Sequence, residues 1–151
     1  MKKHARVAAG LSSLVVAISF AACADSITGP SSTPMSASSS AAVVEGTQWK
    51  LQSLTRADST VTTVSDPDRF TLTFNDGNKI TVRADCNNAF GGFTANGNAI
   101  SVGPMASTKA YCSSAPFDGE YLTALSGDST LAATATTLVM SSSRGRLLFS
   151  K

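Results

Sequence analysis

Three cysteines are the residues best able to do chemistry in this chain of 151 residues: Cys23, Cys86 and Cys112. A cysteine can act as a nucleophile, hold a metal or form a disulfide. The only histidine, His4, lies in an N-terminal segment that we expect to be removed. Without an imidazole, the rest of the chain cannot build a Ser-His or Cys-His catalytic pair or the commonest zinc sites.

Cys86 and Cys112 are predicted to form a disulfide. They are the two thiols that remain if Cys23 is modified, and an oxidising compartment favours pairing them. Closing this loop stabilises the fold by about 3 kcal/mol in the chain-entropy model. The alternative is a reactive thiolate at Cys86. It is disfavoured because Cys86 has no histidine partner and has the negative carboxylate of Asp85 beside it.

The N-terminus has the pattern of a secretory signal peptide. A basic start at residues 2–6 precedes an apolar run of 14 residues at 7–20, which is shorter than the ~20 residues of a spanning helix. Residues 20–23, Phe-Ala-Ala-Cys, are similar to a bacterial lipobox, with phenylalanine where leucine or valine is usual. We expect removal of residues 1–22 and lipidation of Cys23. Release after Ala24 is the other possibility.

Residues 25–42, rich in serine, threonine, proline and alanine, cannot bury enough apolar surface to fold. We therefore divide the chain into a signal peptide (1–22), a lipidated cysteine with a flexible linker (23–44) and one folded domain (45–151). The expected location is the cell envelope, with the membrane as partner through the lipid. In a host with two membranes, Ala24 after the cysteine favours the outer membrane, facing the periplasm.

The charge of the mature chain argues against a nucleic-acid partner. The full chain has a formal charge of +2, but Lys2, Lys3 and Arg6 leave with the signal peptide. Nine of the 12 basic residues then face ten acidic ones, for a net charge of −1. The remaining basic residues form no stripe, so nothing in the pattern favours binding to nucleic acid.

Alternating apolar residues predict a mainly β (α+β) fold, a curled antiparallel sheet or small barrel of about seven to eight strands with one short helix. Asp76-Gly77 and Asn96-Gly97 predict hairpin turns, the first with positive φ at both central residues, and Gly91-Gly92 predicts a bulge or bend. Residues 117–126 predict the helix, with Asp118 as its N-cap. The expected strands are 46–54, 61–64, 69–75, 79–84, 89–95, 98–102, 136–143 and 146–150.

The spaced elements resemble the META domain, the fold of HslJ-like heat-shock lipoproteins. They are Trp49 in the first strand, the Asp-Cys-Asn-Asn run at 85–88, a Gly-Gly-Phe strand, an Asn-Gly turn, and the run Gly-Pro-Met-Ala-Ser-Thr-Lys at 103–109 leading to Cys112. The chain departs from the family at Asp85, where glycine is common, and at 110–111. The resemblance implies a lipocalin-like sheet, an envelope or secreted location, and roles in heat shock, stress tolerance or envelope integrity. It brings no catalytic residues.

Polar residues near the two paired cysteines form a candidate binding surface. The alternative is a structural role, in which the asparagines satisfy backbone groups. We expect no metal and no cofactor, because the Asp-rich segments at 66–68 and 75–78 are explained by turns and Asp118 and Glu120 by a helix start. The surface consists of Asn87, Asn88, Ser107, Thr108, Lys109 and Tyr111.

Together these features predict a non-enzymatic, lipid-anchored envelope protein that binds an envelope protein or a small apolar ligand. A secreted protease inhibitor or chaperone-like module is one alternative. A small hydrolase is another, using carboxylates or Ser107 activated by Lys109.

Overall fold

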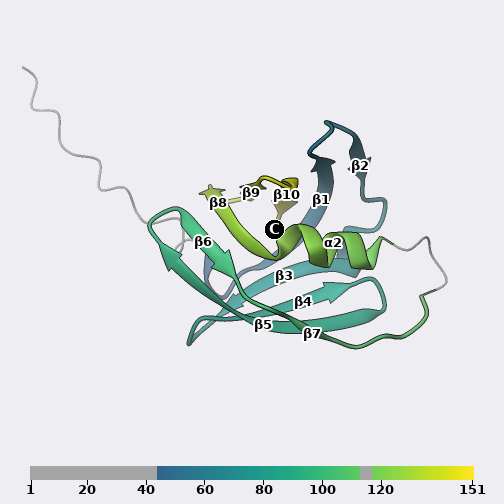
Figure 1. Ribbon diagram of the computed structural model, residues 1–151, viewed down its shortest axis with the longest axis horizontal. Coiled ribbons are helices and arrows are strands. Elements are labelled where there is room, and N and C mark those ends of the chain that lie inside the picture. The colour runs from purple at the N-terminus through teal and green to yellow at the C-terminus, as the bar shows by residue number, and fades with distance from the viewer. Residues whose placement is uncertain (1–43, 113–116) are drawn as a thin grey trace, which may run out of the picture. The chain divides into compact units, whose positions relative to one another are not determined.

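A computed structural model describes residues 44–112 and 117–151 of the chain, so the signal peptide, Cys23 and most of the linker lie outside the described residues. In the described part, no helix is long and apolar enough to span a membrane. The elements, shown in Figure 1, are β1 (Gln48–Arg56), β2 (Val61–Thr63), the 3-10 helix η1 (Pro67–Arg69), β3 (Phe70–Asn75), β4 (Lys79–Ala84), β5 (Asn87–Asn96), β6 (Ala99–Val102), β7 (Ala106–Ser107), α2 (Asp118–Leu125), β8 (Gly127–Ala133), β9 (Thr137–Ser142) and β10 (Gly145–Ser150).

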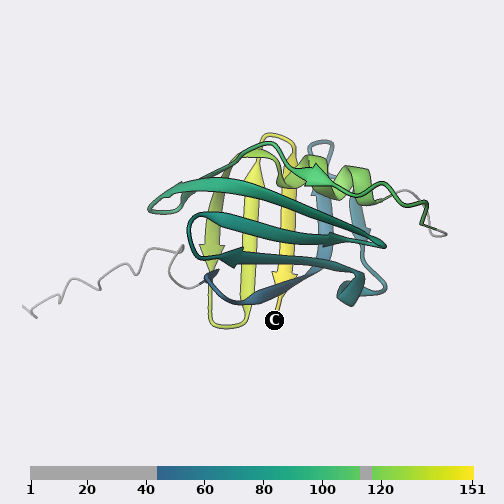
Figure 2. The ribbon, with the colours of Figure 1, turned by 90° about the horizontal axis from the view of Figure 1, so that it is seen from below.

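The strands close into an antiparallel barrel. Its order is β1, β3, β4, β5, β6, β8, β9 and β10, and β10 pairs with β1 to complete the ring. Two short strands lie outside this ring, β2 against β1 and β7 against β5. Figure 2 shows β8, β9, β10 and β1 as a row of upright strands crossed by β3, β4 and β5. The structure confirms the predicted small antiparallel barrel with one short helix.

The barrel interior is filled by its own side chains. Alternate residues of each strand point inward, as the sequence pattern predicts for strands with one apolar face. The register of the last hairpin is as expected, with Leu147 opposite Met140 and Phe149 opposite Leu138. The largest fully buried side chains are Trp49, Tyr121, Phe74, Phe149, Leu51, Leu54, Leu72, Ile80, Leu125, Leu131, Leu138 and Met140.

Helix α2 contributes its apolar face to this core. Tyr121 and Leu125 are both fully buried, and the Tyr121 ring centroid lies 5.8 Å from that of Phe70 and 6.4 Å from that of Phe149. The prediction of Asp118 as N-cap is wrong. Phe117 occupies the cap position without a side-chain cap hydrogen bond, and Asp118 begins the helix and accepts a hydrogen bond from Asn87 instead.

The two predicted hairpins are present, with a difference in the first turn. Positive φ falls on Gly77 and Asn78 rather than on Asp76 and Gly77. The pairing of Asn75 with Lys79 leaves three residues in the loop, so the left-handed positions move one residue along the chain. In the second hairpin Gly97 has a φ of 59°, a positive value that glycine adopts readily.

Of the two predicted alternatives for Gly91 and Gly92, a bulge or a bend, the bulge is absent, since β4 and β5 stay in register through both residues. The register shift lies in β1, between Leu51 and Ser53. Gly91 allows a close approach instead, because a Cβ there would lie 2.8 Å from Cγ of Met105. The segment after β6 therefore packs directly on the β5 backbone.

Strand β8 was not predicted from the sequence. Gly127 was expected only to end the helix, and it also begins β8, with a φ of 78°. Leu131 is the only large apolar residue that β8 buries, beside the small polar Ser129. A strand with one large inward side chain carries almost no alternation signal.

Tyr121→Phe is expected to stabilise the domain by about 1 kcal/mol. The Tyr121 hydroxyl is buried and has no hydrogen-bond partner among the described residues, so its removal relieves an unsatisfied polar group. Burial also raises the pKa of Tyr121 well above 10.0. The unfolded chain releases this proton near pH 10 and the folded chain does not, so the free energy of unfolding falls as the pH rises above about 10.

Urea unfolding of the wild type and of Tyr121→Phe between neutral pH and pH 11 measures both effects. The gain in stability from the substitution is expected to grow above about pH 10. Tyr111→Phe is the matched control, because Tyr111 is 98% exposed and its hydroxyl is not buried on folding. A Tyr121→Phe protein less stable than wild type at every pH would show that the hydroxyl has a partner.

Candidate functional site

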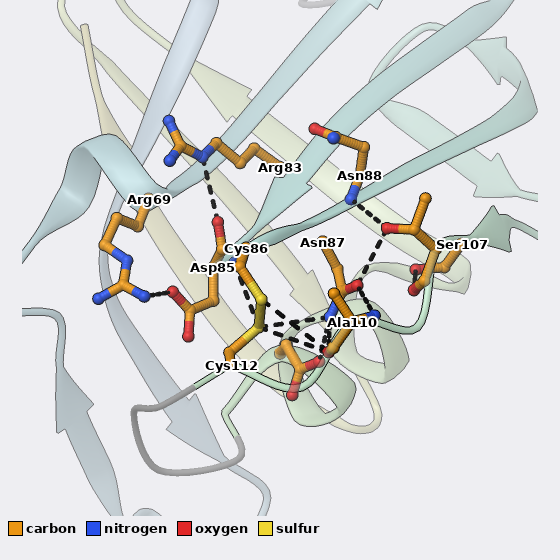
Figure 3. The surroundings of a disulfide bond; sticks show 11 residues. Arg69, Arg83, Asp85, Cys86, Asn87, Asn88, Ser107, Ala110 and Cys112 are labelled. Carbon is orange, nitrogen blue, oxygen red and sulfur yellow. Dashed lines mark hydrogen bonds and ion pairs between the residues drawn. A yellow bond between two sulfur atoms is a disulfide. The ribbon is translucent and has the colours of Figure 1, made fainter.

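The candidate binding surface is built around the predicted disulfide, which the structure contains. Cys86 and Cys112 are joined with a Cα–Cα distance of 5.7 Å (Figure 3). Cys86 lies directly before β5, and Cys112 lies at the end of the segment that follows β7. The disulfide therefore ties the end of residues 104–112 to the start of β5.

The side chain of Asn87 holds the same segment from inside. It is buried, and its Oδ1 accepts hydrogen bonds from the amide of Ala110 at 2.7 Å and from Oγ1 of Thr108 at 3.0 Å. Its Nδ2 donates to the carbonyl of Ala110 and to Oδ2 of Asp118, both at 3.1 Å. One carboxamide thus joins the segment, β5 and the first turn of α2. This is the structural role that the sequence left open for Asn87.

Asn88 also holds the segment at 104–112, but through its backbone rather than its side chain. Its amide donates to Oγ1 of Thr108 at 3.0 Å, and its carbonyl accepts from the amide of Thr108 at 3.0 Å. Because successive residues of a strand face opposite sides, the Asn88 side chain points away from Asn87, as Figure 3 shows. Ser107 lies beside it on β7 and donates from Oγ to the carbonyl of Thr108 at 2.8 Å.

A cavity of about 550 Å³ opens between this segment and α2. Of the predicted surface residues, Asn88 does not line the cavity and the other five do. Lys109 and Tyr111 are exposed at the cavity, and Tyr111 is 98% exposed. The side of α2 adds Asp118, Gly119 and the partly buried Leu122. The arrangement places an exposed cation and an exposed aromatic ring beside the cavity.

The carboxylates that a hydrolase would use both have partners. Glu120 makes a two-point ion pair with Arg56, with Nε–Oε1 at 2.5 Å and Nη2–Oε2 at 2.7 Å. This contact raises the pKa of Arg56 and fastens α2 to β1. Asp118 is held by Asn87. No hydrogen bond connects Lys109 to Ser107 in the described residues, and the same residues contain no group of three or more His, Cys, Asp or Glu placed to hold a metal.

An ion pair between a buried carboxylate and a partly exposed guanidinium lies beside the disulfide, and the sequence does not predict it. Asp85 is 1% exposed, and its carboxylate pairs with the guanidinium of Arg69 (Figure 3). The Asp85 carbonyl accepts from Nε of Arg83 at 3.1 Å, and its amide donates to the carbonyl of Arg69 at 2.7 Å. Asp85 has a φ of 61°, in the region that favours glycine. The sequence feature that marked this position was Asp85 itself, which stands where the family commonly has glycine.

Asn87→Ala is expected to lower the free energy of unfolding by about 2 kcal/mol, because the buried Asn87 carboxamide and its four hydrogen bonds to Thr108, Ala110 and Asp118 are lost. Asn88→Ala is the matched control. Its side chain is exposed and makes no hydrogen bond to a described residue, so we expect a change within about 0.5 kcal/mol. Urea unfolding measures both variants. Equal losses in the two would contradict a special role for the Asn87 carboxamide.

A closed antiparallel barrel of this kind, with one covering helix and a braced surface segment, fits a non-enzymatic module of the binding type. The chain belongs to the META domain family, whose family model matches residues 42–151. This confirms the resemblance that the sequence motifs indicated. No curated protein matches the chain significantly.

Solved structures share the fold at low sequence identity. A protein from Burkholderia xenovorans, solved by NMR, is similar with a TM-score of 0.61 and 22% identity, over 74% of this chain and 85% of that one. A lipocalin-like protein from Bacteroides uniformis, solved by crystallography, is similar with a TM-score of 0.52 and 16% identity, over 72% of this chain and 98% of that one. These likenesses support the lipocalin-like barrel and carry no statement about ligands.

Proposed function

We propose that this protein is a lipid-anchored component of the cell envelope whose META domain acts by binding, in stress tolerance or envelope integrity. The observation that carries the proposal is the segment at 104–112, held by the disulfide at its end and by the Asn87 side chain at residues 108 and 110. Its exposed Lys109 and Tyr111 lie on this braced segment. A surface ordered in advance loses little entropy on binding, which favours recognition.

The N-terminal sequence supports the envelope location. A signal-peptide pattern, the lipobox-like residues 20–23 and the polar linker at 25–42 are the parts that a tethered lipoprotein needs. The disulfide is compatible with folding in an oxidising compartment. The lipid would hold the domain at a membrane, and the linker would let the braced segment reach partners.

The polar groups beside the cavity support binding over catalysis. The Ser107 hydroxyl donates to a backbone carbonyl, and the carboxylates of Asp118 and Glu120 are held by Asn87 and Arg56. A nucleophile needs a base within hydrogen-bond reach, and the described residues provide none for Ser107. These contacts do not favour the hydrolase alternative.

Photo-crosslinking in cells tests the proposal. A photoreactive aromatic residue replaces Tyr111 in the full-length chain, and the matched control carries the same group at Phe90, which is 56% exposed on the outer face of β5. We expect a discrete crosslinked envelope component from position 111 and none from position 90. If that component is a protease or an unfolded client, the inhibitor or chaperone-like alternative is favoured.

Equal crosslinking from both positions, or none from position 111, would contradict binding at this surface. The location is tested separately by fractionation, in which Cys23→Ala is expected to release the protein from the membrane fraction. Retention of the Cys23→Ala protein in membranes would contradict the lipid anchor.

A further inference from the structure

Strand β2 has a free edge. It pairs with β1 and with no other strand of the described residues, and it ends the strand order. Figure 2 shows β2 beside β1 at the end of the row of upright strands. An unpaired strand edge presents a row of backbone donors and acceptors that another chain can pair with.

The hydrogen bonds between β1 and β2 show which backbone groups face this edge. The amide of Arg56 donates to the carbonyl of Thr60 at 2.8 Å, and the amide of Val64 donates to the carbonyl of Gln52 at 2.9 Å. In an antiparallel ladder, bonded and non-bonded pairs alternate along the strand. The bonded positions of this ladder are therefore 60, 62 and 64.

It follows that Val61 and Thr63 direct their N–H and C=O groups away from β1. No described residue forms a hydrogen bond with these four groups. The side chains of both residues are exposed, Val61 by 58%. The edge therefore offers two donors and two acceptors at the spacing of an extended strand.

A recess of about 300 Å³ runs along the same edge. One wall is made by consecutive residues 62–66, and the other by Arg69, Phe70 and Phe117. Because residues from both faces of β2 line the recess, it lies along the strand edge and not on one face. Val64, Phe70 and Phe117 make part of it apolar, which suits an apolar side chain of a strand added to the edge.

Carboxylates flank the edge at both ends. Asp58 before β2 and Asp66 after it are exposed. Asp58 accepts a hydrogen bond from the amide of Thr60 at 2.9 Å, which lowers its pKa and keeps it ionised at neutral pH. A second copy pairing antiparallel about Thr62 would bring Asp58 of one chain opposite Asp66 of the other, and like charges there oppose self-pairing. Basic ends on the added strand would be favoured.

We propose that the free edge of β2 binds an extended segment of another protein by strand addition, with an apolar side chain in the recess and basic residues at the ends of the segment. Backbone bonds to Val61 and Thr63 supply affinity, and the recess and carboxylates supply selectivity. This surface is separate from the cavity beside the disulfide. It goes beyond the proposed function, and failure here leaves the crosslinking result at Tyr111 unaffected.

A synthetic peptide of about nine residues tests the proposal, with alternating threonine and valine between lysine pairs and with blocked ends. Amide hydrogen exchange followed by NMR is the readout on the folded domain with its linker. In the free protein, the Thr62 and Val64 amides are expected to be protected, and those of Val61 and Thr63 to exchange fast. Saturating peptide is expected to protect Val61 and Thr63.

Thr63→Pro removes one outward donor and leaves the β1–β2 ladder intact, because proline is tolerated where an edge N–H faces solvent. We expect it to weaken the peptide at least about tenfold, while Thr63→Ala, which keeps the N–H, binds like wild type. Exchanging the lysines of the peptide for glutamates is expected to weaken binding as well. Urea unfolding verifies that both variants stay folded.

Four results would overturn the proposal. They are no saturable binding up to about 1 mM peptide, unchanged affinity in Thr63→Pro, protection confined to residues other than Val61 and Thr63, and equal binding of the glutamate peptide. A dimer that protects the same two amides without peptide would make a second copy the occupant, against the charge argument.

Discussion

Arg69→Ala is expected to lower the free energy of unfolding by about 3 kcal/mol. Removal of the guanidinium leaves the Asp85 carboxylate buried, with its side chain only 2% exposed, and without its cation. An uncompensated buried charge costs more than the pair contributed, because the carboxylate has lost water and its partner together. Urea unfolding at neutral pH measures the loss.

A second substitution separates charge from packing. In Arg69→Ala with Asp85→Asn, the buried group is neutral, so we expect part of the lost stability to return. The coupling between the two sites is expected to exceed about 1 kcal/mol. Additive effects in this double-mutant cycle would show that the ion pair does not stabilise the corner before the disulfide.

Replacing Cys86 and Cys112 by serine is expected to lower the free energy of unfolding by about 3 kcal/mol. The cross-link spans a sequence separation of 26, so its loss mainly frees the unfolded chain. In the native state Asn87 still holds residues 108–110, so the barrel is expected to remain folded. Guanidinium unfolding, followed by tryptophan fluorescence of Trp49, measures the difference, and the slope of the free energy against denaturant is expected to rise because the uncross-linked unfolded chain exposes more surface.

The double-serine variant has a direct control, since reduced wild-type protein should lose the same stability. Adding Asn87→Ala to the double-serine variant is expected to lower the free energy of unfolding by an amount that differs from the sum of the separate losses. The losses are not additive because both restraints act on one segment. Unchanged stability in reduced wild type would mean that the disulfide does not brace the surface.

Local pattern was enough to predict most of the barrel. The alternation of Leu138 and Met140 with Leu147 and Phe149 predicted both the last hairpin and its register. Strand β8 was not predicted because Leu131 is its only large buried apolar residue. The first turn differed because its loop has three residues, and sequence alone does not set where pairing ends.

The candidate site was predicted in part. Cysteine count and expected export predicted the disulfide, and the same region holds the cavity. The carboxamide network of Asn87 depends on the backbone of Ala110, which lies 23 residues away, so no local pattern reveals it. The ion pair of Arg56 with Glu120 spans 64 residues and joins separate elements, and such pairs follow from the fold rather than from composition.

The domain consists of a rigid frame and two exposed surfaces. The closed barrel and its filled core give a rigid frame, and α2 is fastened to it through Tyr121 inside and Arg56–Glu120 outside. The segment at 104–112 and the free edge of β2 carry the exposed groups. Proteins commonly carry binding groups on loops and edges of a rigid scaffold, which is consistent with the two surfaces that we propose.

We propose that the protein is lipid-anchored and that its disulfide-braced META domain presents these surfaces in the envelope. Intact mass of the protein purified from membranes, with alkylation before and after reduction, tests it most directly. We predict a chain that begins at Cys23 and carries a diacyl or triacyl modification, with Cys86 and Cys112 alkylated only after reduction. An unlipidated chain that begins near Asp25, with Cys86 alkylated without reduction, would contradict both the anchor and the brace.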